Sequence, residues 1–322
     1  MVTNILLILL GFVLLIKGAD FLVSGSVKIA KKLYIPEIII GLTIVSIGTS
    51  MPELIVSITS ALSGHSDIAI GNVIGSNICN ILLILGTAAV IKPLVFKKET
   101  KYIEIPIALV TTFVLLVLGN DSSNIISRRD GFILLALFMV FIAYTIYMGK
   151  KESKEEKEKE SAEQKTEVPK EKFVLLKAFG LIALGMVGLK FGGDMVVDNA
   201  TAIAQILGIS EKVISLTIVA IGTSLPELAT SATAAFKGET DIAIGNAVGS
   251  NIFNVLLILG AGAIIKPMQY SLLYNRDILL LIIITLLLAL FTFTGKKDTM
   301  TRWNGLLCLA IYAGYMVNLF LV

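Results

Sequence analysis

The chain has 322 residues, of which 56% are hydrophobic and 16% charged, and its formal net charge is +3. This composition leaves too little polar surface for a soluble globule, and long apolar runs that can cross ~30 Å of hydrocarbon indicate an integral membrane protein. The net charge itself says little, because in a membrane protein the side on which each charge lies matters more than the sum.

The apolar runs predict ten membrane-spanning helices. No basic segment precedes Ile5–Ile16, so we interpret the first run as a retained helix and not as a cleaved signal peptide. The predicted spans cover residues 3–30, 36–62, 68–91, 102–119, 131–149, 173–200, 210–236, 242–265, 275–293 and 302–321. Cys79 and Cys308 fall inside spans and are expected to be buried small side chains without a disulfide or redox role.

A charged segment separates the fifth and sixth spans. Residues 150–172 contain eight Lys and eight Glu with almost no apolar side chain, so they cannot bury a core. We expect a solvated linker in which Glu/Lys pairs form transient helix, too short to hold a folded regulatory domain. The linker divides the chain into a first five-helix unit over 1–149 and a second five-helix unit over 173–322.

An internal repeat relates the two units. Residues 41–93 align with residues 215–267 at a constant offset of 174 without a gap, and 35 of the 53 positions are identical. The matches include Gly, Pro, Glu and Asn, which indicates gene duplication and not merely shared hydrophobicity. Because each copy has an odd number of spans, the second must enter the membrane from the opposite side. The predicted fold class is therefore an all-α integral membrane protein of two inverted five-helix repeats, a common basis of alternating-access transport.

Lys and Arg residues predict the orientation. With the N-terminus outside, the inside loops hold 19 of these residues and the outside loops hold five. We therefore expect a multi-pass protein of the plasma membrane with both termini outside and the linker cytoplasmic. His65 is expected in a solvated loop, and Trp303 as an interfacial anchor.

Polar residues gather on one face of the second and third spans of each unit. Ser46, Thr49 and Glu53 share a face at i, i+3 and i+7, and Ser76 and Asn80 form an i, i+4 pair. The corresponding residues of the second unit are Ala220, Thr223, Glu227, Ser250 and Asn254. These carboxylate, hydroxyl and amide oxygens suit hard cations such as Ca²⁺ and Na⁺, whereas transition metals favour His or Cys at ligand spacing, and neither is found.

A proline stands immediately before each glutamate. Pro52 and Pro226 lack an N–H and displace the carbonyls four residues earlier, at Gly48 and Gly222. A freed carbonyl at membrane depth needs a partner, and a bound cation is one. Gly–Pro kinks also occur for packing alone, but recurrence beside a carboxylate in both units favours a helix break that belongs to the site.

The glutamates need compensation inside the bilayer. A carboxylate near the bilayer centre costs ~2.5–3.5 kcal/mol or more, and no Lys or Arg lies in the repeat helices near Glu53 or Glu227. Metal ions can supply the compensation, with protonation as the alternative in the empty state. Two carboxylates neutralise one Ca²⁺ or two Na⁺, and shared oxygens make the binding of the two ions mutually exclusive, as antiport requires.

The segments GTSMPE…GNVIGSNICN and GTSLPE…GNAVGSNIFN resemble the repeats of the calcium/cation antiporter superfamily, in its prokaryotic sodium/calcium exchanger branch. The resemblance implies that Glu53 and Glu227 bind Ca²⁺ with help from oxygens of Thr49 and Thr223. It further implies Na⁺ positions and a site centre formed by Ser50, Ser224, Ser76, Ser250, the carbonyls of Ser46 and Ala220, and the amides of Asn80 and Asn254. Electrogenic exchange of about three Na⁺ per Ca²⁺ by alternating access is implied as well.

Two differences from other branches of the superfamily bear on which ions are exchanged. Members that include the potassium-dependent exchangers carry Asp where this chain has Asn254, so the resemblance suggests K⁺-independent exchange. The proton/calcium branch typically has Asn-x-x-Glu where this chain has Thr-Ser-x-Pro-Glu, which favours Na⁺ over H⁺.

The sequence thus predicts a sodium/calcium antiporter without enzyme activity or cofactor. H⁺/Ca²⁺ antiport is the nearest alternative. A cation channel would need a continuous pore and usually a symmetric oligomer, and an intramembrane enzyme would need a nucleophile–base pair or catalytic metal ligands, which we do not find. The expected partners are Ca²⁺, Na⁺ and the lipid bilayer, with no nucleic acid, and the chain is expected to act as a monomer.

Charged residues also interrupt the first and sixth spans. Lys17 with Asp20 and Lys190 with Asp194 are interpreted as local ion pairs or span-end anchors, with a role in the ion pathway as the alternative. These two long spans are expected to slide past a core formed by the second, third, seventh and eighth spans.

Overall fold

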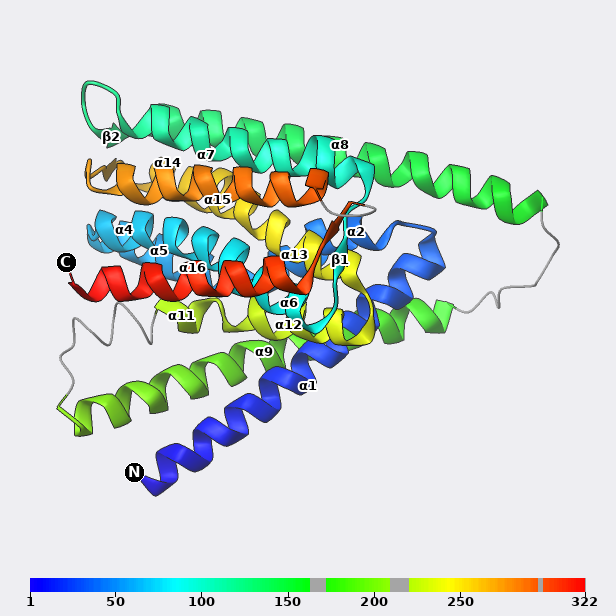
Figure 1. Ribbon diagram of the computed structural model, residues 1–322, viewed down its shortest axis with the longest axis horizontal. Helices are drawn as coiled ribbons and strands as arrows, with labels where there is room; N and C mark the ends of the chain where they lie inside the picture. The colour runs from blue at the N-terminus through cyan, green and yellow to red at the C-terminus, as the bar shows by residue number, and fades with distance from the viewer. Residues whose placement is uncertain (163–171, 209–219, 295–297, 322) are drawn as a thin grey trace.

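The structure is a computed structural model that describes residues 1–162, 172–208, 220–294 and 298–321 (Figure 1). The longer helices are α1 (Val2–Leu33), α4 (Met51–Ser63), α5 (Ser66–Cys79), α7 (Ile105–Gly119), α8 (Arg128–Ala162), α9 (Lys172–Ile206), α12 (Leu225–Lys237), α13 (Thr240–Phe253), α15 (Tyr274–Thr294) and α16 (Arg302–Leu321). The shorter helices are α2 (Glu37–Ile40), α3 (Ser46–Thr49), α6 (Leu85–Ile91), α11 (Ala220–Thr223) and α14 (Gly260–Ile265). The π-helical turns are η1 (Gly41–Val45), η2 (Asn80–Ile84), η3 (Thr100–Glu104) and η5 (Asn254–Leu259).

The helices have the length and apolar character of membrane spans. In the described residues, seven segments could cross a membrane, or eight if the bent pair Glu37–Thr49 and Met51–Ser63 is one span. The prediction of a helical membrane protein is therefore confirmed, while the count of ten remains a prediction. Much of the seventh predicted span, 210–236, lies outside the described residues, which resume at 220.

The fifth predicted span is longer in the structure than in the sequence analysis. Helix α8 does not end at residue 149 but continues to Ala162, well into the predicted linker. Alternating Lys and Glu at i, i+4 spacing support such a solvated helical extension. The rest of the linker, 163–171, lies outside the described residues.

The central layer consists of the two segments that carry the second part of each repeat. Ser66–Ile91 and Thr240–Ile265 are 72% and 78% buried, whereas the other spans lie between 22% and 39%. Apolar side chains one turn apart on α5, at Ile70, Ile74 and Ile78, are almost fully enclosed. In Figure 1 this layer lies between the α7–α8–α15 group and the pair formed by α1 and α9.

Helices α1 and α9 pack closely along glycines. A Cβ built on Gly18 would lie 2.7 Å from the backbone nitrogen of Leu189, and one built on Gly185 would lie 2.7 Å from the carbonyl oxygen of Gly18. Residues without bulky side chains let helix backbones approach this closely in a membrane. The two long predicted spans therefore form one tight pair at the edge of the molecule (Figure 1).

The ion pairs on this helix pair differ from each other. Lys190 and Asp194 pair within α9 at 2.7 Å, as predicted. The prediction for Asp20 was wrong, because its carboxylate lies 2.6 Å from Lys237 Nζ at the end of α12 and not on Lys17. The prediction came from residue spacing, which identifies neighbours on the same helix. Lys237 instead belongs to the other half of the chain.

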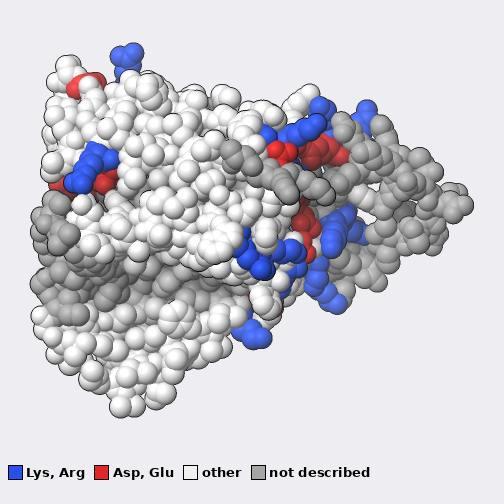
Figure 2. Space-filling view, in the orientation of Figure 1, with Lys and Arg blue, Asp and Glu red and all other residues white. Residues whose placement is uncertain are grey.

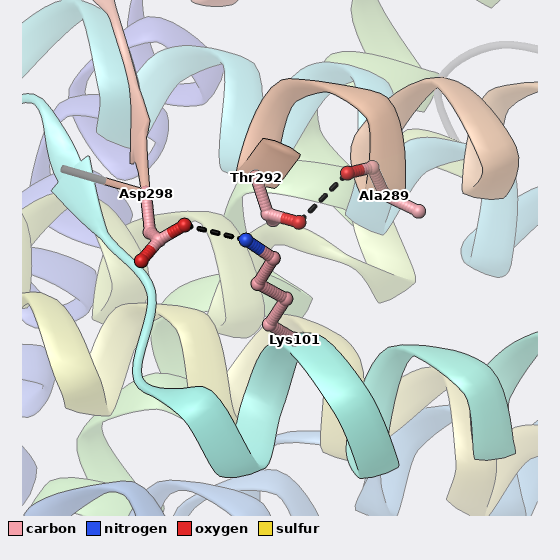
Figure 3. A network of polar contacts seen from close by, with 4 residues as sticks. All are labelled: Lys101, Ala289, Thr292 and Asp298. Carbon is pink, nitrogen blue, oxygen red and sulfur yellow. Dashed lines mark hydrogen bonds and ion pairs between the residues drawn. The ribbon is translucent and has the colours of Figure 1, made fainter. Parts of the chain in front are cut away.

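Short strand pairs link loops of the two halves. Strand β1 (Leu94–Val95) pairs antiparallel with β4 (Thr299–Met300), and β2 (Ile125–Ile126) pairs antiparallel with β3 (Met268–Gln269). Beside β4, Lys101 on η3 forms an ion pair with Asp298, next to the turn of α15 where Thr292 donates to the Ala289 carbonyl (Figure 3). The loops at the helix ends are thereby held across the repeat boundary.

Most charged side chains seen in Figure 2 gather toward the end of the molecule where α8 ends and α9 begins, here called the linker face. Lys97 and Asp241 pair there at 2.6 Å. Burial lowers the pKa of Lys97, but the hydrogen bond and negative charge of Asp241 outweigh it and raise this pKa above its usual value. Both termini lie toward the opposite end, the termini face (Figure 1).

The burial of both cysteines and the exposure of His65 agree with the sequence-based expectations. Cys79 and Cys308 are buried and are not joined in a disulfide. His65 is exposed in the turn between α4 and α5, and Trp303 is exposed in the first turn of α16.

Candidate ion-binding site

Two helix breaks lie at the centre of the structure. Helix α3 ends at Thr49 and α4 begins at Met51, and the segments on either side are bent by 48°. Ser50 at the break has φ −84° and ψ 10°, and Pro52 follows in the first turn of α4, where its missing N–H is tolerated. Helices α11 and α12 break in the same way at Ser224, with φ −89° and ψ 5°. The predicted break beside both prolines is confirmed.

The two glutamates begin the second half of each broken helix. Glu53 on α4 and Glu227 on α12 are each 1% exposed. Ser50 Oγ donates to Glu227 Oε1 at 2.9 Å, and Ser224 Oγ donates to Glu53 Oε1 at 3.3 Å. The other oxygen, Oε2, of each carboxylate is buried and has no hydrogen-bond partner among the described residues. Each half thus binds one oxygen of the other half's carboxylate.

Four buried serines surround the glutamates. Ser50 Oγ lies 2.9 Å from Ser250 Oγ on α13, and Ser224 Oγ lies 3.3 Å from Ser76 Oγ on α5. Each contact joins a helix break of one half to a central helix of the other. The serines that the sequence analysis assigned to Na⁺ positions are therefore brought together beside the carboxylates.

The threonines bond to asparagines that the sequence analysis missed. Thr49 Oγ1 donates to Asn246 Oδ1 at 3.0 Å, and Thr223 Oγ1 donates to Asn72 Oδ1 at 3.4 Å. Asn246 and Asn72 each follow a glycine in a Gly-Asn pair that both repeats contain. This repetition was the only sequence feature that could have marked them as site residues. Ser46 starts α3, where its carbonyl oxygen lies 3.4 Å from Thr49 Oγ1, and Ala220 starts α11.

Four further asparagines meet where α5 and α13 pass into π-helical turns. Asn80 Nδ2 donates to Asn251 Oδ1, and Asn254 Nδ2 donates to Asn77 Oδ1, both at 2.9 Å. The Oδ1 atoms of Asn80 and Asn254 are buried and have no hydrogen-bond partner in the described part of the chain. The sequence analysis predicted Asn80 and Asn254 but missed Asn77 and Asn251.

A groove of about 430 Å³ reaches the helix breaks from the side of α9. Most of its lining is apolar. Pro52 and Pro226 line it beside the polar or charged residues Thr49, Thr223, Lys190, Asp194 and Asp198. The groove therefore joins the region of the glutamates to two carboxylates on the termini-face half of α9.

The centre of the molecule thus offers oxygen ligands without protein partners. The described residues contain no group of three or more His, Cys, Asp or Glu side chains placed to hold a metal ion. Two carboxylates with hydroxyl and amide oxygens form instead the donor set that hard cations prefer. Broken helices enclose these oxygens within a bundle of membrane spans, an arrangement that is typical of membrane transporters of hard cations.

Comparison with known proteins identifies the kind of transporter. The family described as "Sodium/calcium exchanger protein" matches residues 3–147 and 177–321. The chain is 38% identical over 285 residues to the inner membrane protein YrbG of Escherichia coli, covering 88% of this chain and 87% of that protein. It is 33% identical to the sodium/calcium exchanger MaX1 of Methanosarcina acetivorans over 376 aligned positions, covering 99% of each.

A solved structure agrees with these relatives. The sodium-calcium exchanger NCX_Mj, soaked with 2.5 mM Na⁺ and 0.1 mM Ca²⁺, matches with a TM-score of 0.84 and 34% identity over 98% of each chain. This chain therefore belongs to the sodium/calcium exchanger family, a family of membrane antiporters and not of enzymes.

Proposed function

We propose that this protein exchanges Na⁺ for Ca²⁺ across the plasma membrane by alternating access, with about three Na⁺ for each Ca²⁺ and without K⁺. One observation carries the proposal. Four buried acceptor oxygens, namely Oε2 of Glu53 and Glu227 and Oδ1 of Asn80 and Asn254, have no hydrogen-bond partner among the described residues. Buried polar atoms are rarely left unpaired, and bound hard cations are the partners that oxygens of this kind accept.

The proposed sites divide the oxygens between the two ions. Glu53 and Glu227 bind Ca²⁺ with Thr49 and Thr223, and their combined charge neutralises it. Na⁺ uses the same carboxylates together with Ser50, Ser224, Ser76, Ser250, the carbonyls of Ser46 and Ala220, and the amides of Asn80 and Asn254. Because the carboxylates are shared, the two ions exclude each other. A third Na⁺ leaves the loaded site positive, so the exchange is electrogenic.

The proposed architecture is two inverted five-helix units, 1–149 and 173–322, in ten spans. The odd number of spans in each sequence repeat and the broken helices of both halves support it. The excess of Lys and Arg in alternate loops supports both termini outside and linker 150–172 in the cytoplasm. We propose that α1 and α9 slide as one pair past the central helices, which their close mutual packing at the edge of the molecule supports.

Ca²⁺ uptake into proteoliposomes tests the counter-ion. Vesicles containing the purified protein are loaded with Na⁺ and diluted into Na⁺-free medium with ⁴⁵Ca²⁺, with K⁺ present or absent. We expect rapid uptake that needs the outward Na⁺ gradient, does not need K⁺ and is not replaced by a pH gradient. Uptake with a proton gradient but not with outward Na⁺ would identify an H⁺/Ca²⁺ antiporter and refute the Na⁺ assignment.

A further inference from the structure

A reciprocal pair of side chains joins the two halves at the end of the site. Asn77 Nδ2 on α5 donates to the backbone carbonyl of Asn251 on α13 at 3.2 Å, and Asn251 Nδ2 donates to the backbone carbonyl of Asn77 at 3.2 Å. Both side chains are buried. Because a carbonyl oxygen only accepts hydrogen bonds, the NH₂ group of each amide has to face the opposite backbone.

This constraint passes to the neighbouring pair of amides. With its Nδ2 on a carbonyl, Asn77 presents Oδ1 to Asn254, and Asn254 can answer only with Nδ2, which lies 2.9 Å away. Asn251 constrains Asn80 in the same way at 2.9 Å. The Oδ1 atoms of Asn80 and Asn254 are thereby turned away from Asn77 and Asn251, and both lack a hydrogen-bond partner among the described residues. Two backbone carbonyls thus fix amide orientations that are ambiguous for an isolated Asn.

We propose that Asn77 and Asn251 are positioning residues that set the polarity of the cation site. Each orients the amide ligand of the opposite half so that oxygen, and not NH₂, faces the ion. A flipped Asn254 would place hydrogen-bond donors beside a cation and would set two oxygens against each other at Asn77. The same geometry requires residue 254 to donate a hydrogen bond to Asn77 Oδ1, so this position stays uncharged and the negative charge of the site is confined to Glu53 and Glu227. This inference rests on the proposed function, because it concerns the same site.

The test removes the donor of Asn77 while keeping its shape. In Asn77→Asp, an ionised carboxylate has no proton for the Asn251 carbonyl, whereas a protonated one restores a donor on one oxygen and an acceptor on the other. We expect the apparent KM for Ca²⁺ uptake to exceed that of wild type about tenfold at about pH 8 and to approach wild type at about pH 6. Asn77→Ala has neither donor nor acceptor and is expected to raise KM at both pH values.

Controls separate the effect from other titrations. The titratable groups near these asparagines are Glu53 on α4, Glu227 on α12, and Cys79 on α5 beside Tyr312 on α16. They are unchanged in the variant, so each KM is compared with wild type at the same pH. Asn199→Asp is the matched control, because Asn199 Nδ2 on α9 donates within its own helix, to the Met195 carbonyl at 2.7 Å. Its KM ratio is expected to stay near one at both pH values.

The outcomes are distinct. If the KM of Asn77→Asp equals that of wild type at both pH values, and only the maximal rate or the melting temperature falls, then Asn77 merely packs the helices and the proposal is overturned. If this variant does not fold, Asn251→Asp provides the symmetric test through Asn80. Wild-type vesicles without Na⁺-driven uptake would refute the proposed function instead. Calorimetric Ca²⁺ binding to the same purified variants, at both pH values, would then still decide whether the two asparagines orient the site.

Discussion

The carboxylates of Glu53 and Glu227 show how single residues define the site. Each has one oxygen that accepts a hydrogen bond from a serine of the other half and one buried oxygen without a partner among the described residues. An ionised carboxylate that is removed from water needs an opposite charge or a full set of donors. Under the proposed function, a cation between the two supplies the missing interaction to both, so each glutamate is expected to be needed for the same ion.

Replacing either glutamate tests this requirement. In Glu53→Gln or Glu227→Gln the side chain keeps its shape but loses its charge and one acceptor, so we expect Na⁺-driven Ca²⁺ uptake to fall at least about 100-fold, as when a buried charged ligand is removed. Glu104→Gln is the matched control, because Glu104 is also a buried carboxyl of the first half but lies on η3, outside the site. It is expected to retain uptake. Wild-type uptake in either site variant would contradict the proposed ligands.

An acid introduced at position 254 would be a third carboxyl group in the candidate site. Asn77 Oδ1 accepts a hydrogen bond from residue 254, so an acid introduced by Asn254→Asp fits the observed geometry only while it is protonated. Once ionised, it repels Asn77 Oδ1 and adds a negative charge to the site. We therefore expect uptake by Asn254→Asp, relative to wild type, to decline as the pH rises. An unchanged pH profile in the vesicle assay would show that the hydrogen bond to Asn77 does not govern this position.

The sequence predicted the residues that share one helix face but not their partners across the halves. Glu53, Thr49 and Ser46 could be placed together because helical spacing is fixed within one segment. Asn77 lies three residues before Asn80 and carries no charge or helix break, so nothing local distinguished it. Its importance comes from Asn251, and such a contact depends on how two distant helices pack.

Among the helices, α1 and α9 differ in how they are tied to the rest of the molecule. Lys237 at the end of α12 holds α1 through Asp20 at 2.6 Å and Ser24 at 2.8 Å. The repeat offset pairs Asp20 with Asp194 but pairs Lys237 with Ser63, so the second half lacks the lysine for a mirror-image ion pair. This tie therefore favours the observed arrangement of α1 over its symmetric counterpart.

Loss of this ion pair should shift the conformational equilibrium. An ion pair that is partly exposed contributes ~0.2–1 kcal/mol, so we expect Lys237→Met to reduce the population of the observed arrangement by up to about fivefold. Hydrogen exchange of the α1 segment around Asp20 measures the change and should become faster. Lys190→Met is the matched control, because its partner Asp194 lies on the same helix.

Exchange of the two charges separates electrostatics from packing. A double variant with Asp20→Lys and Lys237→Asp reverses the pair and is expected to restore slow exchange in α1, since the attraction is kept. If the charge-reversed protein exchanges as fast as Lys237→Met, the ion pair does not hold α1 and the expectation is refuted.

The positions of the helix breaks could be predicted from the sequence, whereas the contacts between distant helices could not. Pro52 and Pro226 predict the helix breaks at Ser50 and Ser224, because a proline lacks an N–H and so removes a hydrogen bond within its own helix. By contrast, α8 extended beyond the predicted span, since apolar length marks where a helix leaves the membrane and not where it ends. The ion pair between Asp20 on α1 and Lys237 was likewise not predictable from residue spacing within one helix.

At the scale of the whole molecule, each half completes the site of the other. Ser50 serves Glu227, Ser224 serves Glu53, and Asn77 and Asn251 each orient an amide of the opposite half. The proposed ion site therefore lies where the two halves meet, in the most buried layer of the molecule. Its fixed charge comes from two carboxylates, so the site is neutral with one Ca²⁺ and carries one net positive charge with three Na⁺.

Under the proposed stoichiometry, this charge difference makes transport depend on membrane voltage. In vesicles loaded with Na⁺, the exit of about three Na⁺ for each Ca²⁺ that enters removes one positive charge per cycle, so an interior-positive potential should promote Ca²⁺ uptake and an interior-negative potential should oppose it. A K⁺ gradient with valinomycin sets the potential, and the same gradient without valinomycin controls for K⁺ itself. We expect the final Ca²⁺ accumulation ratio to change about tenfold for each ~60 mV. Accumulation that is independent of potential would instead indicate two Na⁺ per Ca²⁺, with a site that stays neutral in both loaded states.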